Sequence, residues 1–210
     1  MYDSTHTIDA FLNAAAAKQP APGGGSITAL VGALSASMGE MVLNYSVGKK
    51  NLAAFEPELR SALAEFTRLR AMMLQLMIED QAAYEAITAL RKLPVDSAER
   101  IEKYPPTLLA CIRVPEAMAA AGVVALELCD RLAEKTNVYL LSDLAICAEL
   151  AMAIVRCGIH NVRINLADVT NAADKASMRK TIDSVLIRGT QLIQKVIPRI
   201  WKRIEIPQPA

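Results

Sequence analysis

Apolar side chains recur along this chain at intervals of three and four residues, which place them on one face of a helix. Glycine, proline and short polar stretches interrupt the pattern and separate the predicted helices. These helices cover about residues 7–17, 26–47, 51–91, 107–135, 142–165 and 171–203. No linker divides the chain after residue 26, so the pattern predicts one domain over residues 1–210. Its expected fold is an all-α, mostly antiparallel bundle of five to six helices.

Small residues are concentrated in the predicted helix over 26–47, which we expect at the centre of the fold because small side chains let helices approach closely. Residues 93–106, which contain Pro94, Pro105 and Pro106, are expected to form a loop with a short helical turn. Pro115 is expected to kink or restart the helix that follows. In the last helix, the basic side chains are expected to face solvent: Arg179, Lys180, Arg188, Lys195, Arg199 and Lys202.

Composition narrows the function class. Apolar residues make up 53% of the chain and aromatic residues 4%, which favours helices over sheets. The net charge of +1 offers no field for nucleic acid or an anionic membrane, and no uninterrupted apolar run of 18 residues predicts a membrane span. Surplus apolar surface indicates a homodimer. The start of the chain lacks a signal-peptide pattern, so a cytoplasmic protein is expected.

The four cysteines are isolated, and with only two histidines no zinc motif is present. Buried free thiols are the expected state of Cys111, Cys129, Cys147 and Cys157, and no metal site is predicted.

Residues 20–26, Pro-Ala-Pro-Gly-Gly-Gly-Ser, form the most unusual segment of the chain. The two prolines stiffen the approach to a permissive glycine turn, and Ser26 is placed to act as the N-cap of the next helix. Bare backbone amides at a helix N-terminus can face a ligand. A tight structural turn between closely crossing helices is the alternative.

Two aspartates are candidates for chemistry. Asp80 falls on the apolar stripe of its helix, so it is either a buried carboxylate with a function or a group at the rim. Tyr84 lies one turn further along that face, as a ring to stack on a ligand or as a core residue. Asp143 lies in the first turn of a helix, where the helix dipole alone can explain an acid. Asn161 and Asn165 are one turn apart, a spacing more typical of a link between helices than of a site.

Seven segments together resemble the cyclodeaminase/cyclohydrolase family, which includes the C-terminal domain of formiminotransferase-cyclodeaminase and the stand-alone methenyltetrahydrofolate cyclohydrolases. Residues 20–26 resemble its P-[TA]-P-G-G-G-[SG] motif. The others are V-G-K-K at 47–50, E-D-Q-A-A-Y at 79–84, K-L-P at 92–94, V-P at 114–115, S-D at 142–143 and N-V-R-I-N-L at 161–166. Residues 135–143 depart from the family pattern, because they keep only Asn137 where the family usually has two asparagines. This difference bears on substrate preference.

The resemblance implies an enzyme of tetrahydrofolate one-carbon chemistry. The expected reaction is hydrolysis of 5,10-methenyltetrahydrofolate to 10-formyltetrahydrofolate. The first alternative is a formiminotetrahydrofolate cyclodeaminase, which closes the ring and releases ammonia; the second is a non-catalytic helical binding or assembly protein. Neither reaction requires a metal or redox cofactor, so none is expected beyond the folate-bound substrate.

The resemblance also implies roles for residues of this chain. Asp143 is the expected acid or base near the reacting carbon, with Ser142 beside it, and Asp80 is the expected partner carboxylate; the two aspartates could exchange these roles. The residues expected to bind substrate are Pro22, Gly23, Gly24, Gly25, Ser26, Lys49, Tyr84, Asn137, Asn161, Arg163 and Asn165.

Overall fold

A computed structural model describes residues 1–205 of the chain. Within these residues it contains six α-helices, three short 3₁₀ helices and no strand. The α-helices are α1 (Ile8–Ala16), α2 (Gly24–Asn44), α3 (Glu56–Arg91), α4 (Ala98–Leu132), α5 (Leu141–Asn165) and α6 (Ala172–Ile204). The 3₁₀ helices are η1 (Lys50–Phe55), η2 (Val138–Leu140) and η3 (Leu166–Asp168). The predicted all-α fold is confirmed.

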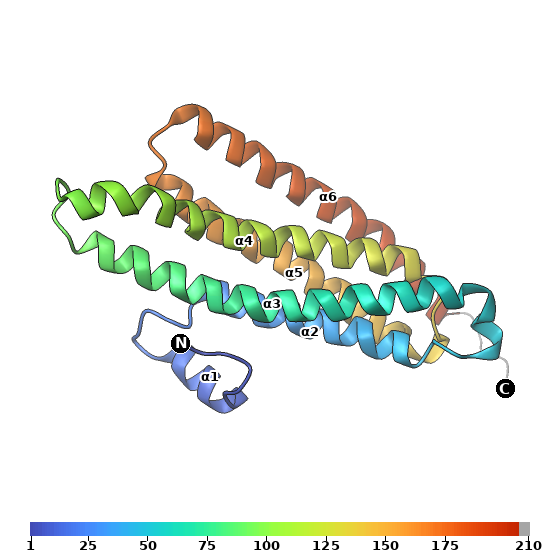
Figure 1. Ribbon diagram of the computed structural model, residues 1–210. Coiled ribbons are helices and arrows are strands. Elements are labelled where there is room, and N and C mark those ends of the chain that lie inside the picture. Colours follow the sequence, from blue (N-terminus) through green and yellow to red (C-terminus); the bar gives the residue numbers. More distant parts are fainter. Residues whose placement is uncertain (206–210) are drawn as a thin grey trace.

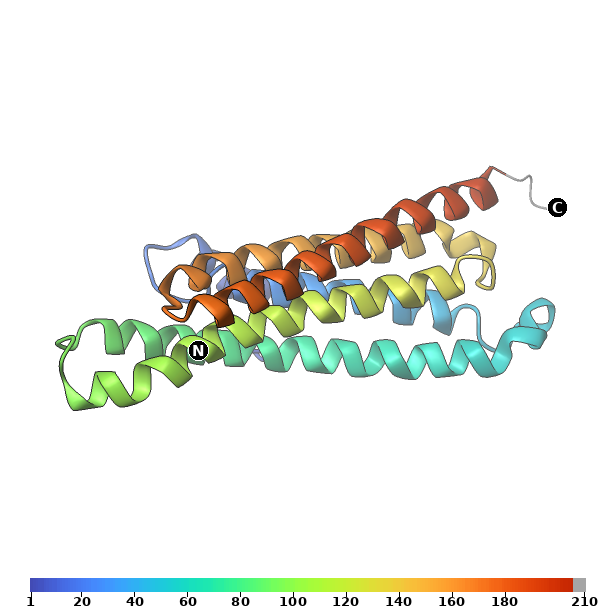
Figure 2. The ribbon, with the colours of Figure 1, turned by 90° about the horizontal axis from the view of Figure 1, so that it is seen from above.

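The long helices form a bundle around one shared core (Figure 1). Helices α3 and α4 pass in front of α2 and α5 in this view, and α6 packs along α4 and α5. Seen from above, the long helices follow one common axis (Figure 2). The short α1 lies outside this bundle and contributes Phe11 to the core.

Small residues let α2 pack closely against its neighbours, as the sequence predicted. A β-carbon at Gly39 would come within 2.7 Å of the Phe66 ring on α3, and one at Gly32 would overlap Met73. On the side facing α5, the buried hydroxyl of Ser35 donates a 2.8 Å hydrogen bond to the carbonyl of Cys147. Both contacts require small side chains on α2, because a larger side chain at these positions would push the neighbouring helix away.

The predicted loop over residues 93–106 is wrong in its second half. Helix α4 begins at Ala98, after Ser97 accepts a hydrogen bond from the Arg100 amide as N-cap, and it continues through Pro105 and Pro106. Proline removes a helical hydrogen bond, but the two carbonyls left free belong to the exposed residues 101 and 102, where water can bind them. An exposed helix end therefore tolerates the two prolines.

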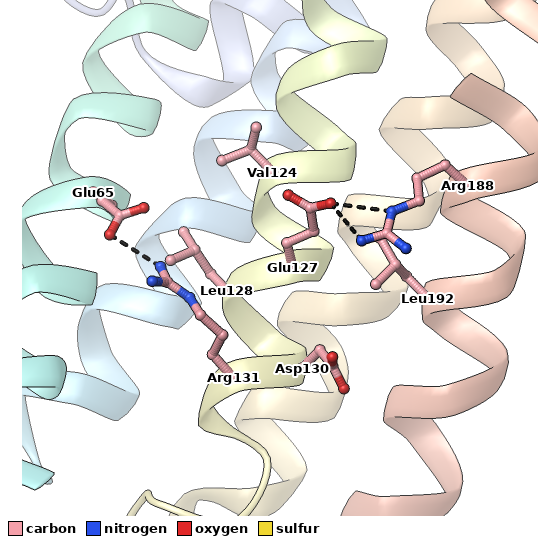
Figure 3. A pocket seen from close by; sticks show the side chains of 8 residues that line it. All are labelled: Glu65, Val124, Glu127, Leu128, Asp130, Arg131, Arg188 and Leu192. Carbon is pink, nitrogen blue, oxygen red and sulfur yellow. Dashed lines mark hydrogen bonds and ion pairs between the residues drawn. The ribbon is translucent and has the colours of Figure 1, made fainter. Parts of the chain in front are cut away.

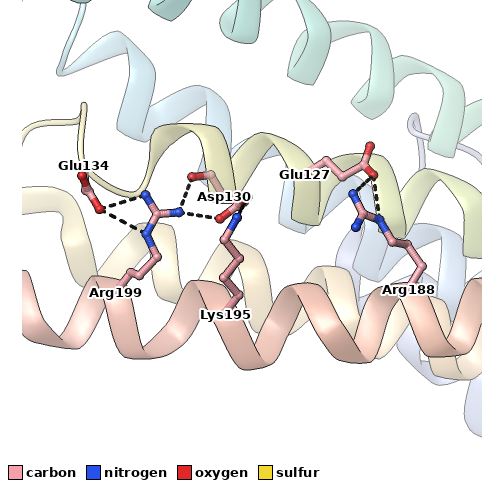
Figure 4. Close-up of polar contacts among 6 residues, drawn as sticks. All are labelled: Glu127, Asp130, Glu134, Arg188, Lys195 and Arg199. Carbon is pink, nitrogen blue, oxygen red and sulfur yellow. Dashed lines mark hydrogen bonds and ion pairs between the residues drawn. The ribbon is translucent and has the colours of Figure 1, made fainter.

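Ion pairs attach α6 to α4 through three of the basic residues of α6 (Figure 4). Arg188 and Lys195 are exposed as expected, and Arg199 is half-buried. Arg188 pairs with Glu127 at 2.8 Å, and Lys195 pairs with Asp130 at 2.7 Å. Arg199 contacts both Asp130 and Glu134. These contacts recur along the helix at roughly two-turn and one-turn intervals, because the two helices run side by side.

Three of the four cysteines are buried as predicted, and Cys157 is exposed. The apolar pattern of α5 misled the prediction, since Cys157 continues an apolar stripe that points away from the bundle.

Three segments are long and apolar enough to cross a membrane, by length and composition alone: Gly24–Asn44, Ala98–Leu132 and Val138–Asp168. Between 44% and 56% of the most apolar stretch of each is buried inside the bundle. The sequence argument against a membrane span, which required uninterrupted apolar runs, therefore does not hold for these segments.

Candidate functional site

The glycine loop leads into α2 beside a carboxylate on α3. Helix α2 begins at Gly24, and Gly23 is its N-cap without any side-chain hydrogen bond. The prediction that Ser26 is the N-cap is therefore wrong. Ser26 lies in the first turn, fully buried, and its hydroxyl donates a 3.3 Å hydrogen bond to Oδ2 of Asp80. Its backbone amide donates to the same carboxylate.

Gly25 allows this approach of α2 to α3. A β-carbon at position 25 would overlap the carboxylate of Asp80, so any other residue would displace one of the two groups. The backbone conformation of Gly25 is an ordinary helical one that any residue can adopt. The requirement for glycine therefore comes from the close contact with Asp80 and not from the backbone conformation. The structure thus shows a tight crossing at this loop, and Gly23, Gly24 and Gly25 also line a cavity.

Asp80 is a half-buried carboxylate without an ion-pair partner among the described residues. Burial raises its pKa, because a low-dielectric surrounding disfavours the charged form, and the two hydrogen bonds from Ser26 oppose this effect. A carboxyl with a raised pKa can exchange protons nearer to neutral pH than an ordinary aspartate.

Asp80 opens into a cavity of about 330 Å³ between the glycine loop, α3, α4 and α5. Its volume falls in the range of small-molecule sites. Tyr84 lines the cavity with 45% of its surface exposed, which excludes the interpretation as a core residue. Other predicted site residues that line it are Gly23, Gly24, Gly25, Asn161 and Asn165.

The two asparagines both hold the helices together and face the cavity. Asn161 donates a 3.4 Å hydrogen bond to Oγ1 of Thr28 on α2. Asn165 donates a 3.0 Å hydrogen bond to the carbonyl of Cys111 on α4. That carbonyl is free because Pro115, four residues later, has no N–H to bind it. The proline thus supplies an acceptor that ties α4 to α5 at the cavity wall.

Several cavity residues were missed by the sequence analysis: Ala21, Gln81, Arg91, Cys111, Pro115 and Ile164. Arg91 lies eleven residues after Asp80, three helical turns along the same face, so the register of α3 could have revealed it. Its guanidinium pairs with Asp168 at 2.8 Å. The hydroxyl of Tyr104 donates to the same carboxylate at 2.7 Å, and both contacts lower the pKa of Asp168.

The remaining predicted residues do not reach this cavity within one chain. Asp143 lies 18 residues before Asn161 on α5, a separation of about 27 Å along the helix axis. Ser142 beside it is exposed, and Lys49 follows α2 at the same end of the bundle. Asn137 is buried there, and its side chain donates to the Tyr45 carbonyl and accepts from the Tyr139 amide.

Two other predicted residues are also set apart from the cavity lining. Arg163 is exposed and pairs with Asp183 on α6 at 3.1 Å. Pro22 is buried behind the loop.

A larger hollow of about 470 Å³ lies between α3, α4 and α6 (Figure 3). Its charged side chains are largely paired with one another: Arg131 with Glu65 at 3.0 Å and Arg188 with Glu127 at 2.8 Å. None of the predicted site residues lines it. The smaller cavity at Asp80, with an unpaired carboxylate, is therefore the better candidate site.

Comparison with known proteins gives consistent matches over most of the chain. The family model described as formiminotransferase-cyclodeaminase matches residues 7–184. A methenyltetrahydrofolate cyclohydrolase from Methylorubrum extorquens is 27% identical over 94% of this chain and 97% of its own length. A formimidoyltransferase-cyclodeaminase from Sus scrofa is 29% identical over 92% of this chain, which spans only 36% of that longer protein. The crystal structure of a formiminotetrahydrofolate cyclodeaminase from Thermotoga maritima superposes with a TM-score of 0.81 at 26% identity, covering 95% of this chain and 96% of that one.

Proposed function

Since the chain belongs to the formiminotransferase-cyclodeaminase family, we propose that it is an enzyme of tetrahydrofolate one-carbon chemistry and that it hydrolyses 5,10-methenyltetrahydrofolate to 10-formyltetrahydrofolate. The observation that carries the proposal is the unpaired, half-buried carboxylate of Asp80 at the wall of a cavity of small-molecule size.

The charge of Asp80 suits this substrate. The methenyl group carries a positive charge shared by N5, the bridging carbon and N10. A carboxylate without a cation of its own stabilises such a charge, and more strongly where water is largely excluded. Ser26 positions the carboxylate through its two hydrogen bonds and does not itself line the cavity.

The same carboxyl can carry the proton. Water adds to the bridging carbon while Asp80 accepts one of its protons, which gives a neutral tetrahedral carbon that bears a hydroxyl group. Asp80 then returns the proton to N5 as the bond between N5 and the carbon breaks. The hydroxyl loses its proton to solvent and becomes the formyl oxygen on N10. The net products are 10-formyltetrahydrofolate and one proton.

Other cavity residues suit the rest of a folate. Tyr84 offers an exposed ring for stacking on the pterin. Arg91 offers a cation to the carboxylates of the glutamate tail, a role that the sequence analysis gave to Lys49 and Arg163. We also infer that two copies of the chain associate, as its apolar surface suggests.

Formiminotetrahydrofolate cyclodeaminase activity is the second candidate, because the Thermotoga maritima structure of that name superposes over nearly the whole chain. Both reactions pass through a tetrahedral carbon between N5 and N10, so one carboxyl could serve either.

The test follows the absorbance of the methenyl group with purified protein. Loss of 5,10-methenyltetrahydrofolate faster than in the enzyme-free control is the expected result. Appearance of the methenyl absorbance from 5-formiminotetrahydrofolate, with release of ammonia, would instead indicate the cyclodeaminase. If neither rate exceeds the control, both catalytic proposals fail and a non-catalytic binding protein becomes the better explanation.

A further inference from the structure

Arg91 is the single cation among the described residues that line the candidate cavity. Its guanidinium is held by two partners from other parts of the chain. Nη2 donates a 2.8 Å hydrogen bond to Oδ2 of Asp168, which lies on η3. Tyr104 on α4 also accepts a hydrogen bond from the guanidinium, and both contacts raise the pKa of Arg91, because they stabilise its charged form. Three elements therefore meet at this one side chain.

Tyr104 and Arg91 share one oxygen of Asp168. The Tyr104 hydroxyl donates to Oδ2 at 2.7 Å, and the same oxygen accepts from Nη2 of Arg91. Arginine and a carboxylate often form a fork, with two parallel hydrogen bonds to the two oxygens. Here the guanidinium hydrogen-bonds to one oxygen only. Because a guanidinium has five N–H donors, donors of Arg91 remain for a ligand in the cavity.

Arg100 fixes the position of the tyrosine. Its guanidinium lies over the Tyr104 ring, 5.5 Å from the ring centroid, in a cation–π contact. The same group donates a 2.7 Å hydrogen bond to the carbonyl of Leu93, just after α3 ends. The end of α3 and the start of α4 lie at the same extremity of the bundle (Figure 1). Arg100 thereby ties the part of α4 that carries Tyr104 to the end of α3 that carries Arg91.

Stability alone does not account for this cluster. The Arg91 and Asp168 side chains are both exposed, and an exposed ion pair contributes little to the free energy of unfolding. Arg91 also lines the cavity that contains the carboxylate of Asp80. The glutamate tail of a folate bears two carboxylates, for which a guanidinium is the matching donor. A guanidinium already held in place binds a carboxylate more tightly, because less side-chain freedom is lost on binding.

We propose that Tyr104 and Asp168 are positioning residues, which hold the Arg91 guanidinium at the cavity wall so that it binds the glutamate tail of the substrate. Tyr104 also keeps Arg91 from closing onto both oxygens of Asp168. The cluster thus makes the enzyme prefer folates over pteroates, which lack the glutamate. The identity of the ligand rests on the proposed function.

The first test compares two substrates that differ only in the tail, 5,10-methenyltetrahydrofolate and 5,10-methenyltetrahydropteroate. Tyr104→Phe removes one hydroxyl and should raise KM for the folate about threefold with kcat unchanged, because Arg91 can then fork onto Asp168. The KM for the pteroate should stay at the wild-type value. An equal rise for both substrates would indicate a structural role for Tyr104 and overturn the proposal.

A double-mutant cycle shows whether Tyr104 acts through Arg91. If it does, Arg91→Ala combined with Tyr104→Phe should raise KM for the folate no further than Arg91→Ala alone, about fivefold. Independent effects would multiply to about 15-fold. The multiplied value would overturn the proposal.

Asp168 is tested by a removal and a conservative change. Asp168→Ala should raise KM for the folate about threefold, and Asp168→Asn should recover most of this loss, because an amide oxygen still accepts from Arg91 and Tyr104. An unchanged KM in the alanine variant would overturn the role of Asp168. Thr107→Val is the matched control on α4, since that hydroxyl donates only within its own helix, to the carbonyl of Lys103. It should leave both KM values unchanged.

Binding separates this proposal from the proposed function. Calorimetry with tetrahydrofolate and tetrahydropteroate requires no turnover. Wild type should bind tetrahydrofolate about fivefold more tightly, and Tyr104→Phe should lose most of this preference. If wild type turns over neither folate but keeps the binding preference, the proposed function fails and the positioning role stands. If wild type binds the two compounds equally or binds neither, the positioning role fails.

Discussion

The backbone of Gly25 lies against the carboxylate of Asp80, with no room between them for a β-carbon. The carboxylate is consequently held in place from two sides, by the α2 backbone and by the hydrogen bonds from Ser26. Gly25→Ala should lower kcat/KM about 100-fold, because a shift of the reacting group by about 1 Å has effects of that order.

Gly189→Ala serves as the matched control for this change. Gly189 lies on α6, and an added β-carbon there would meet Val155 at 3.2 Å; neither residue lines the cavity. Its activity should stay near wild type. If the Gly25→Ala enzyme were as active as wild type, the position of the Asp80 carboxylate against α2 would not be needed for catalysis.

Asp80→Asn should reduce kcat at least about 100-fold, the usual contribution of a general acid or base. It should also raise the melting temperature at neutral pH, because it removes a half-buried charge while Ser26 can still donate to the amide oxygen. Glu79→Gln, at the exposed neighbouring position, should change neither quantity. The two effects together separate a functional carboxylate from a structural one, since loss of a structural group would lower stability.

The pH dependence follows from the raised pKa of Asp80. As pH falls, kcat/KM should decline through an apparent pKa above the ordinary aspartate value of about 4. The pKa of Asp80 is about 4 in the unfolded chain and higher in the folded chain. Between these two pKa values the folded chain binds more protons than the unfolded chain, so the contribution of Asp80 to the free energy of unfolding falls as pH rises. Urea unfolding across this pH range measures the difference in the free energy of unfolding between wild type and Asp80→Asn. This difference should disappear below the ordinary pKa of aspartate, where Asp80 is protonated in both the folded and the unfolded chain. A pH profile unchanged in a residually active Asp80→Glu variant would argue against this assignment.

Arg91→Ala should raise KM about fivefold with little change in kcat, if its guanidinium binds the tail of the substrate throughout the reaction. The effect is limited because Arg91 is 42% exposed and already paired with Asp168. Arg113→Ala removes an exposed arginine of α4 that pairs with Glu116, and should leave KM unchanged. A fall in kcat alone would assign Arg91 to the chemical step.

Asp130→Asn should lower the free energy of unfolding by about 1 kcal/mol, because its carboxylate meets both Lys195 and Arg199 with 18% of its side chain exposed. Added salt should shrink the difference. The exposed pair of Glu99 and Lys103 offers the comparison, and Glu99→Gln should cost less. Denaturant unfolding at low and high salt measures both.

Helical periodicity was sufficient to predict the bundle, because the apolar stripes of α3 to α6 are long and regular. Predictions from the local sequence were wrong where the solvent exposure of the residue in the fold decided its structure. Pro105 and Pro106 indicated a loop, but at an exposed helix end their missing hydrogen bonds cost little. Cys157 followed an apolar stripe, and the stripe faces outward.

The candidate site was predictable where the chain approaches it locally, at the glycine loop and along α3. Asp80 and Tyr84 lie in the cavity as their helical register suggested. Arg91 lies on the same face, but three turns away, and only the packing of α4 and α5 completes a cavity there. Sequence order also could not reveal that Asp143 and Lys49 lie at the other end of the bundle, because that depends on the direction of each helix.

The buried amide of Gln81, next to Asp80, is bound to the backbone of Tyr2: it accepts from the Tyr2 N–H at 2.6 Å and donates to the Tyr2 carbonyl at 2.7 Å. The backbone of Tyr2 is thereby held at the residue that follows Asp80 in α3. A purification tag fused ahead of Tyr2 would begin next to Gln81, which lines the cavity. Helix α6 ends at the opposite extremity of the bundle (Figure 1). Affinity tags, fluorophores and groups for surface attachment should therefore be placed after α6 in kinetic experiments.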